Sequence, residues 1–424
     1  MAPTGQQPSV WLEFSPLAGH LGCVNLGQGF PDWDPPDFIQ QAAARAVQGG
    51  ACSKYARSAG HPRLVQAIAG AYGPRLEREI HPETDVLVTV GASEAIFLSV
   101  MGHVRPGDEV IVFEPAFDIY YGALAMAGAV VRPVSLLAGD DGKMAVDLAG
   151  LRAMLSPRTR AMIINTPHNP GGMVMDRPTL EKIDQALRDY PDCVVIADEV
   201  YEHLVYGDAV HTPVATVGKL GSRTLSIYSA GKNFSVTGWK IGWVIAPQEL
   251  LAPLQIAQQW VVFSVATPLQ EAVAEALERG GKPYGGAADY YGWLRQSYDR
   301  KRELLLAGLG EVGLEPMAPD GSFFILCRIA GQPEEAFAFP EEIRSLHRDG
   351  VLQMDTTTTG RRDYNFCRNL SLHHGVTAIP ASAFFSPQTA AGGADWVRFA
   401  FCKEEAVLRE AVKRLTAKTP FPAT

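Results

Sequence analysis

Short apolar, β-branched runs that alternate with helical stretches constrain the fold of this chain most. Val86-Leu-Val-Thr-Val90 precedes a helical stretch over 93–104, and Ala161-Met-Ile-Ile-Asn165 precedes another. The runs Cys193-Val-Val-Ile-Ala197 and Thr224-Leu-Ser-Ile-Tyr228 repeat the pattern. Continuous apolar strands of this kind are buried on both faces, which is typical of a mostly parallel sheet covered by helices. The predicted fold class is therefore α/β.

The pattern changes after about residue 285. A long helical stretch over 290–309 leads to Ser322-Phe-Phe-Ile-Leu326, and residues 396–401 alternate as an antiparallel strand. The 424 residues agree with two or three domains of about 150 residues each. We predict three parts: an N-terminal segment over 1–40 that joins the small domain, a large domain over 41–290 and a small α+β domain over 291–424.

Composition excludes several classes of function. The chain has 37 Lys and Arg against 46 Asp and Glu, with no clustered basic stretch, so no nucleic-acid partner is predicted. The six cysteines are widely spaced without a C-x-x-C pair, which disfavours a metal site or a disulfide framework. The sequence begins without a signal-peptide pattern and has no run of about 18 apolar residues, so neither secretion nor a membrane span is predicted. We expect a reducing, cytoplasmic location.

Groups that can bind a ligand, namely a helix N-terminus and several polar side chains, follow four of the predicted strands at the point where each strand ends. In chain order they are Ala92 and Ser93, Asn169, Asp198 and Tyr201, and Ser229 and Lys232. In open α/β sheets ligands bind at the carboxyl ends of the strands. An amide, a carboxylate, a phenol, a hydroxyl and a lysine in one crevice suit an electrophilic, phosphorylated aromatic cofactor held as a lysine Schiff base. The sequence therefore predicts pyridoxal phosphate.

The motifs that contain these residues resemble those of a known family. Ser229-Ala-Gly-Lys232-Asn-Phe-Ser-Val-Thr-Gly-Trp-Lys240 resembles the lysine motif of fold-type I, class I aminotransferases. Asn165-Thr-Pro-His-Asn169-Pro-Gly-Gly and Asp198-Glu-Val-Tyr201 resemble two further signatures of that family. Matches near residues 25–32 and at Val397-Arg398-Phe extend the resemblance to both ends. It implies an aspartate-aminotransferase-like fold, with a large domain that binds pyridoxal phosphate and a smaller α+β domain.

The resemblance implies a role for each residue around the cofactor ring. Lys232 would bind the cofactor aldehyde and then act as base and acid at the substrate Cα. Asp198 would keep the pyridine nitrogen protonated, although an Asp after a strand is also a common helix N-cap. Asn169 and Tyr201 would donate hydrogen bonds to the ring hydroxyl oxygen, and Asn169 also suits a turn with the following Pro-Gly. Phe117 would stack on the ring, with a core phenylalanine as the alternative.

A second set of residues would bind the cofactor phosphate. The backbone amides of Ala92 and Ser93 open a predicted helix, and helix N-termini bind phosphate. The resemblance adds Ser229 and Lys240 to this site. It also implies that Tyr55 reaches the phosphate of a neighbouring subunit, so we expect a homodimer with shared active sites.

The substrate would lie between the two domains. The resemblance assigns Arg398 to the substrate α-carboxylate, which a guanidinium binds through two parallel hydrogen bonds, and Asn169 would share that carboxylate. Trp11 and Gly29 would close the pocket over the substrate, and Phe263 would line it.

Two positions differ from the kynurenine aminotransferase/glutamine transaminase K group, which the chain otherwise resembles most within the family. Ser93 stands where those enzymes commonly have a tyrosine, and Phe263-Ser264 stands where they have an aromatic residue followed by histidine. One phenol and one imidazole are therefore missing from the side chains that would be expected to surround the substrate. A roomier pocket, or one suited to aliphatic side chains, follows from this difference.

The predicted function is transfer of an amino group from a neutral or aromatic L-amino acid to a 2-oxo acid by a ping-pong mechanism. Kynurenine, glutamine, methionine and phenylalanine are the expected kinds of donor. Cysteine-conjugate β-lyases belong to the same group, so C–S β-elimination is the alternative, together with a pyridoxal-phosphate oxidase. A regulator without catalysis is a further alternative, which the presence of Lys232, Asp198 and Arg398 disfavours.

Overall fold

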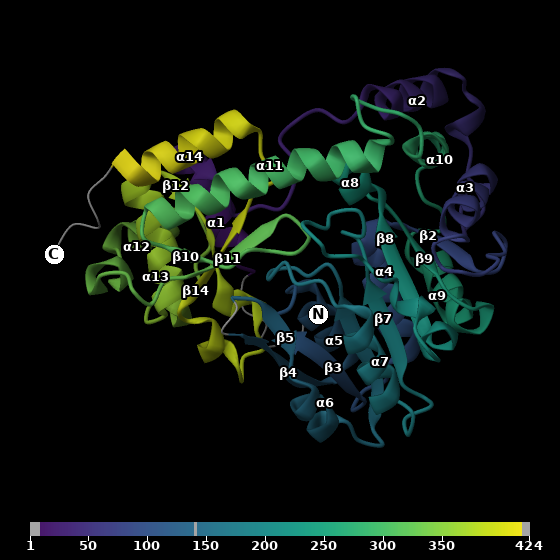
Figure 1. Ribbon diagram of the computed structural model, residues 1–424, viewed down its shortest axis with the longest axis horizontal. Coiled ribbons are helices and arrows are strands. Elements are labelled where there is room, and N and C mark those ends of the chain that lie inside the picture. Colours follow the sequence, from purple (N-terminus) through teal and green to yellow (C-terminus); the bar gives the residue numbers. More distant parts are fainter. Residues whose placement is uncertain (1–8, 140–141, 418–424) are drawn as a thin grey trace.

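The computed structural model describes residues 9–139 and 142–417, which form two lobes around separate sheets. Figure 1 shows the lobe with the larger sheet on the right and the other on the left, with helix α11 (Tyr290–Glu311) running along the top of both. Residues 1–8 of the predicted N-terminal segment, 140–141 of the predicted large domain and 418–424 of the predicted small domain lie outside the described residues.

An eight-stranded sheet forms the centre of the large lobe, in the order β2-β9-β8-β7-β6-β3-β4-β5. Its strands are β2 (Val86–Val90), β3 (Glu109–Glu114), β4 (Val130–Ala138), β5 (Met144–Val146), β6 (Thr159–Asn165), β7 (Val194–Asp198), β8 (Thr224–Ser229) and β9 (Ile241–Ile245). The neighbours from β8 through β4 pair in parallel, whereas β9 is antiparallel to both of its neighbours and β5 is antiparallel to β4. The sheet is mostly parallel, as its apolar runs predicted.

Helices cover both faces of this sheet, because alternate side chains of each strand point to opposite sides. In β3, Val110 and Val112 belong to one core cluster with helices α4, α5 and α9, whereas Ile111 and Phe113 belong to another with α6 and α7. The helices of the large lobe are α2 (Asp37–Gln48), α3 (Pro62–Tyr72), α4 (Gly91–His103), α5 (Ile119–Ala127), α6 (Leu148–Met154), α7 (Arg177–Ala186), α8 (Ala230–Asn233), α9 (Gln248–Val261) and α10 (Thr267–Gly280).

The small lobe contains an antiparallel sheet in the order β10-β11-β14-β13. Its strands are β10 (Glu315–Pro316), β11 (Phe324–Arg328), β13 (Ile379–Pro380) and β14 (Trp396–Ala400), and its helices are α12 (Glu341–Arg348), α13 (Arg362–Asn369) and α14 (Glu405–Ala417). Strand β1 (Val24–Asn25) pairs in parallel with β12 (Val376–Thr377), so the beginning of the chain packs with this lobe.

A buried ion pair fixes the first helix, α1 (Trp11–Leu21), to helix α13. Arg368 donates to both carboxylate oxygens of Glu13, at 2.6 and 3.1 Å, and both side chains are almost fully buried. Burial raises the pKa of Glu13 even though Arg368 acts in the opposite direction. The pair therefore sets the place of α1 on the small lobe.

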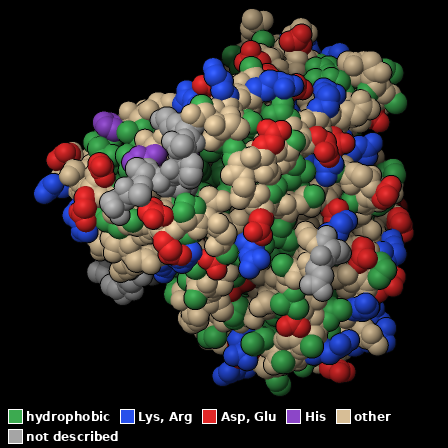
Figure 2. Space-filling view, turned by 60° about the vertical axis from the view of Figure 1, so that its left-hand side comes forward, with side chains coloured by type: hydrophobic (Ala, Val, Ile, Leu, Met, Phe, Trp, Pro, Cys, Tyr) green, Lys and Arg blue, Asp and Glu red, His purple; other side chains and the backbone are tan. Residues whose placement is uncertain are grey.

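Charged side chains of both signs are interspersed on the face shown in Figure 2. This distribution agrees with a modest net charge of −9 over the whole chain. Among the helices of the described ranges, none combines the length and the apolar character that crossing a bilayer requires.

Replacing Arg368 with methionine leaves the Glu13 carboxylate buried without its cation. We expect the free energy of unfolding to fall by about 3–5 kcal/mol, because an unpaired buried charge is strongly destabilising. The double variant Arg368→Met with Glu13→Leu is expected to recover most of that loss. Equilibrium unfolding in urea, followed by circular dichroism, measures both. A double variant as unstable as the single one would contradict this account of the pair.

Candidate active site

A pocket of about 250 Å³ lies where the two lobes meet, at the carboxyl ends of the large-lobe strands. Asp198 ends β7 and Ser229 ends β8, while Asn169 follows β6. Gly91 opens α4 directly after β2. The small lobe contributes Arg398 from β14 and Phe324 from β11. The sheet thus brings together large-lobe residues that are as far apart in the sequence as Gly91 and Ile241.

Twelve of the side chains and backbone positions singled out from the sequence line this one pocket. They are Trp11, Gly29, Ala92, Ser93, Phe117, Asn169, Asp198, Tyr201, Ser229, Lys232, Lys240 and Arg398. Tyr55 and Phe263 lie elsewhere, on the surface, with 84% and 54% of their area exposed. Their rings pack edge to face, 5.2 Å apart. Neither residue is among the described residues that line the pocket.

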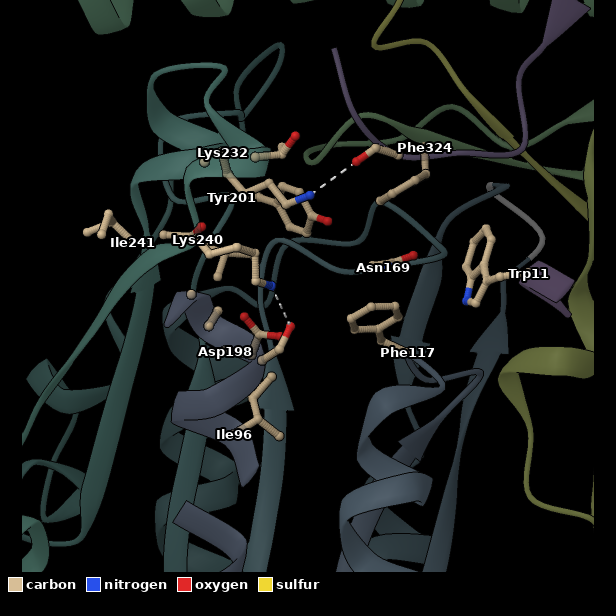
Figure 3. A pocket seen from close by; sticks show the side chains of 18 of the residues that line it. Trp11, Ile96, Phe117, Asn169, Asp198, Tyr201, Lys232, Lys240, Ile241 and Phe324 are labelled. Carbon is tan, nitrogen blue, oxygen red and sulfur yellow. Dashed lines mark hydrogen bonds between the residues drawn. The ribbon is translucent and has the colours of Figure 1, made fainter. Parts of the chain in front are cut away.

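Lys232 points into the pocket from the short helix α8 (Figure 3). Its Nζ donates to the carbonyl oxygen of Gly29 at 3.1 Å and lies 5.5 Å from the centre of the Tyr201 ring. Burial lowers the pKa of the Lys232 ammonium to about 8. A neutral amine is therefore accessible near physiological pH, which attack on an aldehyde requires.

Asp198 presents a carboxylate with unused hydrogen-bonding capacity. Its Oδ2 accepts a hydrogen bond from the Tyr120 hydroxyl at 2.6 Å, while its buried Oδ1 has no partner among the described residues. Burial raises the pKa of Asp198 to about 6, although the hydrogen bond from Tyr120 acts to lower it. A cationic ring N–H is the kind of group that would satisfy the free oxygen.

Tyr120 was not singled out from the sequence. It lies in the first turn of α5 (Ile119–Ala127), whereas Phe117 lies just before Asp118, the residue that caps this helix. Their ring centres are 6.0 Å apart in an edge-on arrangement. One buried residue thus supports both the carboxylate and the aromatic wall of the pocket.

The N-terminus of α4 forms a cradle for an anion. Gly91 adopts a positive φ of 69°, and a Cβ there would lie only 3.1 Å from the Lys240 Nζ. Lys240 also donates to the Ser93 hydroxyl at 3.4 Å, which Figure 3 shows as a dashed line. Free amides at the start of a 13-residue helix, a hydroxyl and an ammonium together suit a phosphate group.

Arg398 is a buried guanidinium without an ion-pair partner among the described residues. It donates to the Asn169 Oδ1 at 2.9 Å and to the Gly27 carbonyl oxygen at 2.5 Å, while its Nε has no partner. Burial lowers the pKa of Arg398 to about 10, so the side chain stays charged at neutral pH. A carboxylate that entered the pocket would form an ion pair with the Arg398 guanidinium.

Aromatic rings surround the same guanidinium. The ring centres of Phe324, Phe384 and Trp11 lie 4.2, 4.8 and 5.4 Å from it. The Trp11 indole also donates to Asp118 at 2.9 Å, which holds the indole beside the pocket. Phe324 and Asp118 were not expected from the sequence. Phe324 lies in an apolar strand run, and nothing in that run distinguishes it from a core residue.

Comparisons with known proteins identify the family. The model for aminotransferase classes I and II matches residues 22–415. The chain belongs to this family. It is 40% identical to a kynurenine–oxoglutarate transaminase from Dictyostelium discoideum, over 95% of this chain and 92% of that protein. Both the aminotransferase function and the resemblance to the kynurenine group are confirmed.

Solved structures of the family agree with the fold. N-succinyldiaminopimelate aminotransferase from Mycobacterium tuberculosis is 39% identical with a TM-score of 0.82, covering 96% of this chain and 97% of that one. An Escherichia coli protein with a methionine aminotransferase function is 32% identical with a TM-score of 0.83, covering 99% of each chain. The predicted fold-type I architecture is confirmed, and the enzyme is a pyridoxal-phosphate-dependent aminotransferase.

Replacing Tyr120 with phenylalanine removes one hydrogen bond to Asp198 but keeps the ring that packs on Phe117. We expect the pKa of Asp198 in the cofactor-free protein to rise by roughly 1–2, because a hydrogen bond to a charged group contributes about 1.5–3 kcal/mol. Carbon-13 NMR titration of the carboxyl groups measures it. The matched control is Tyr121→Phe, whose hydroxyl donates to Glu114 and the Phe384 carbonyl instead. Equal changes in the two variants would refute the assignment.

Proposed function

We propose that the amino donor is an L-amino acid with an uncharged side chain, of the aromatic or methionine type. The observation that carries this proposal is the wall of the pocket beyond Arg398. Trp11 and Phe324 pack against Arg398 there, and Phe117 is a further aromatic residue that lines the pocket. Arg398 is the one arginine among the described residues that line it. A second substrate carboxylate would therefore find no further guanidinium among the described residues that line the pocket, although a loop arginine such as Arg57 or Arg361 could reach it.

The proposed roles follow from the contacts described above. The cofactor supplies a ring that accepts the electron pair released at the substrate Cα. Arg398 and Asn169 hold the α-carboxylate and thereby orient the Cα–H bond toward Lys232. The Nζ of Lys232, neutral in part because burial lowers its pKa to about 8, takes that proton and later returns it. Asp198 holds the ring nitrogen in its protonated form.

We also propose a homodimer with shared active sites. Tyr55 and Phe263 support it, because these aromatic side chains form an exposed pair on one chain. The same region exposes further apolar side chains of α9, namely Ile256, Trp260 and Val261. Exposed apolar area of this kind marks an interface with another protein surface.

A cytoplasmic location is part of the same proposal. All six cysteines are free thiols, at positions that the structure describes. Free thiols persist in reducing compartments, whereas proteins of oxidising compartments form disulfides.

Single-turnover reactions with individual amino acids, without any 2-oxo acid, test the proposed function. Kynurenine, glutamine, methionine, phenylalanine, aspartate and N-succinyldiaminopimelate form the panel. We expect the visible band of the bound cofactor to bleach with one equivalent of 2-oxo acid per site, fastest for an uncharged side chain. Fastest reaction of a dicarboxylate would overturn the proposed substrate class.

The same experiment separates the alternative chemistries. A cysteine conjugate is added to the panel, because β-elimination on this scaffold would release pyruvate and ammonia over many turnovers while the visible band persists. An oxidase would consume dioxygen and accumulate peroxide. Either result in place of stoichiometric bleaching would contradict the proposed physiological transamination.

Mixing two inactive variants tests the shared site. Tyr55→Ala and Lys232→Ala homodimers each lack one required residue in both sites. After subunit exchange, each mixed dimer has one site with Lys232 from one chain and Tyr55 from the other. We expect about a quarter of wild-type activity from an equal mixture, since half of the dimers carry one intact site of two. No recovery despite verified subunit exchange would show that Tyr55 acts within its own chain.

A further inference from the structure

A buried carboxylate lies directly behind the pocket, on residue Glu202, which follows Tyr201 in the chain. Only 3% of Glu202 is exposed. Its Oε1 accepts a hydrogen bond from the Asn233 side chain at 3.2 Å and one from the Tyr72 hydroxyl. Its Oε2 lies 2.7 Å from a guanidinium nitrogen of Arg75. None of these four side chains is among those that line the pocket.

Asn233 connects this carboxylate to the lysine. It follows Lys232 directly, and both residues belong to the four-residue helix α8 after β8. Glu202 belongs to the segment after the neighbouring strand β7. The hydrogen bond between Asn233 and Glu202 therefore joins the backbone that carries Lys232 to the backbone that carries Tyr201. Figure 3 shows the side chains of Lys232 and Tyr201 next to each other in the pocket.

Arg75 is the cation that faces Glu202. His203 also lies close, with its Nε2 at 3.7 Å from the carboxylate, and its ring nitrogens lie 3.2 and 3.4 Å from Arg75. Burial, together with Arg75, keeps the pKa of His203 well below its usual range, so the ring is neutral. It stacks on Tyr291 at 3.7 Å between ring centres. The carboxylate thus has one ionic partner, held beside a fixed neutral ring.

Packing holds Tyr72 in place. Its ring lies 4.5 Å from that of Tyr228 and 5.7 Å from that of Trp243, and all three residues are at most 2% exposed. Glu202 is therefore held by a rigid aromatic cluster on one side and by Arg75 on another. A buried ion pair is weak evidence for stability, because the desolvation of both charges opposes folding. The position of the Glu202 carboxylate, in contrast, is fixed by its hydrogen bonds and by its ion pair with Arg75.

We propose that Glu202 is a positioning residue for Lys232, which acts through Asn233, and that Tyr72 and Arg75 hold the carboxylate in place. This inference rests on the proposed role of Lys232 in binding the cofactor and moving the Cα proton. Proton transfer of this kind depends on placement to a fraction of an ångström. Since Glu202 and Asn233 do not contact the substrate site, they act on the rate and not on substrate binding.

The variant Asn233→Ala tests the connection. We expect kcat to fall about tenfold or more, because α8 loses the contact that fixes Lys232. The KM for the amino acid is expected to stay within about twofold, since Arg398 and Asn169 are unchanged. Titration of the cofactor-free protein with pyridoxal phosphate is expected to give a Kd about tenfold higher, because the amine is no longer held in place.

Asn369→Ala is the matched control. Asn369 is also buried and donates two hydrogen bonds, to the carbonyl oxygens of Ala336 and Ala338, far from the pocket in the small lobe. Both alanine variants are expected to lower the Tm, but only Asn233→Ala is expected to change kcat and cofactor affinity. Asn233→Leu, which fills the same space without donating, replaces the alanine variant if that one does not fold. Equal kcat values for the Asn233 variant and for Asn369→Ala would overturn the inference.

Two variants of Glu202 separate the hydrogen bond from the charge. Glutamine keeps an oxygen that accepts from Asn233, so Glu202→Gln is expected to retain kcat within about threefold. Glu202→Leu removes the acceptor and is expected to match Asn233→Ala. The double variant Glu202→Leu with Asn233→Ala is expected to be no slower than either single one, because both break the same contact. Additive losses would overturn the inference.

Lys232→Ala distinguishes failure of this inference from failure of the proposed function. If that variant still forms the visible band of the bound cofactor, the proposed role of Lys232 is wrong and the positioning inference falls with it. If the band disappears while Asn233→Ala and Asn369→Ala behave alike, the function stands and only the positioning role is refuted.

Discussion

Two buried ionisable groups with unused hydrogen-bonding capacity determine what this structure can do. Arg398 has an unpartnered Nε and no ion pair among the described residues, and Asp198 has an unpartnered oxygen. Burying such groups is costly unless a partner completes them. Both residues lie on interior strands, β14 and β7, each paired on its two sides. The rigid sheets thus hold polar groups whose partners are the ligands.

The order of the strands explains why so few segments build the whole site. Strands β6, β7 and β8 are adjacent and parallel, so the polar residues that follow them meet at one edge of the sheet. Strand β2 carries the cofactor-facing end of α4 to the same edge, although it joins the sheet through the antiparallel β9. The small lobe then closes the pocket from the other side with Arg398.

The sequence allowed prediction of the residues that follow apolar strand runs, because a polar residue at that position has a structural meaning. Lys232 and Asp198 are of this kind. Tyr120 and Glu202 were missed, since a tyrosine in an apolar helix and a glutamate after Tyr201 carry no local signal. Their roles depend on contacts between distant segments. Tyr55 could be recognised only by resemblance, because its proposed partner lies on a second chain.

Helix α1 carries a tryptophan whose surroundings depend on the angle between the two lobes. The Glu13–Arg368 pair fixes the helix to the small lobe, whereas the Trp11 indole donates to Asp118 on the large lobe. Any change in the angle between the lobes must therefore alter the surroundings of this indole at the same time as the gap between Arg398 and Lys232. Once separated from the signal of the chain's six other tryptophans, the fluorescence of Trp11 would report such a change without an attached label.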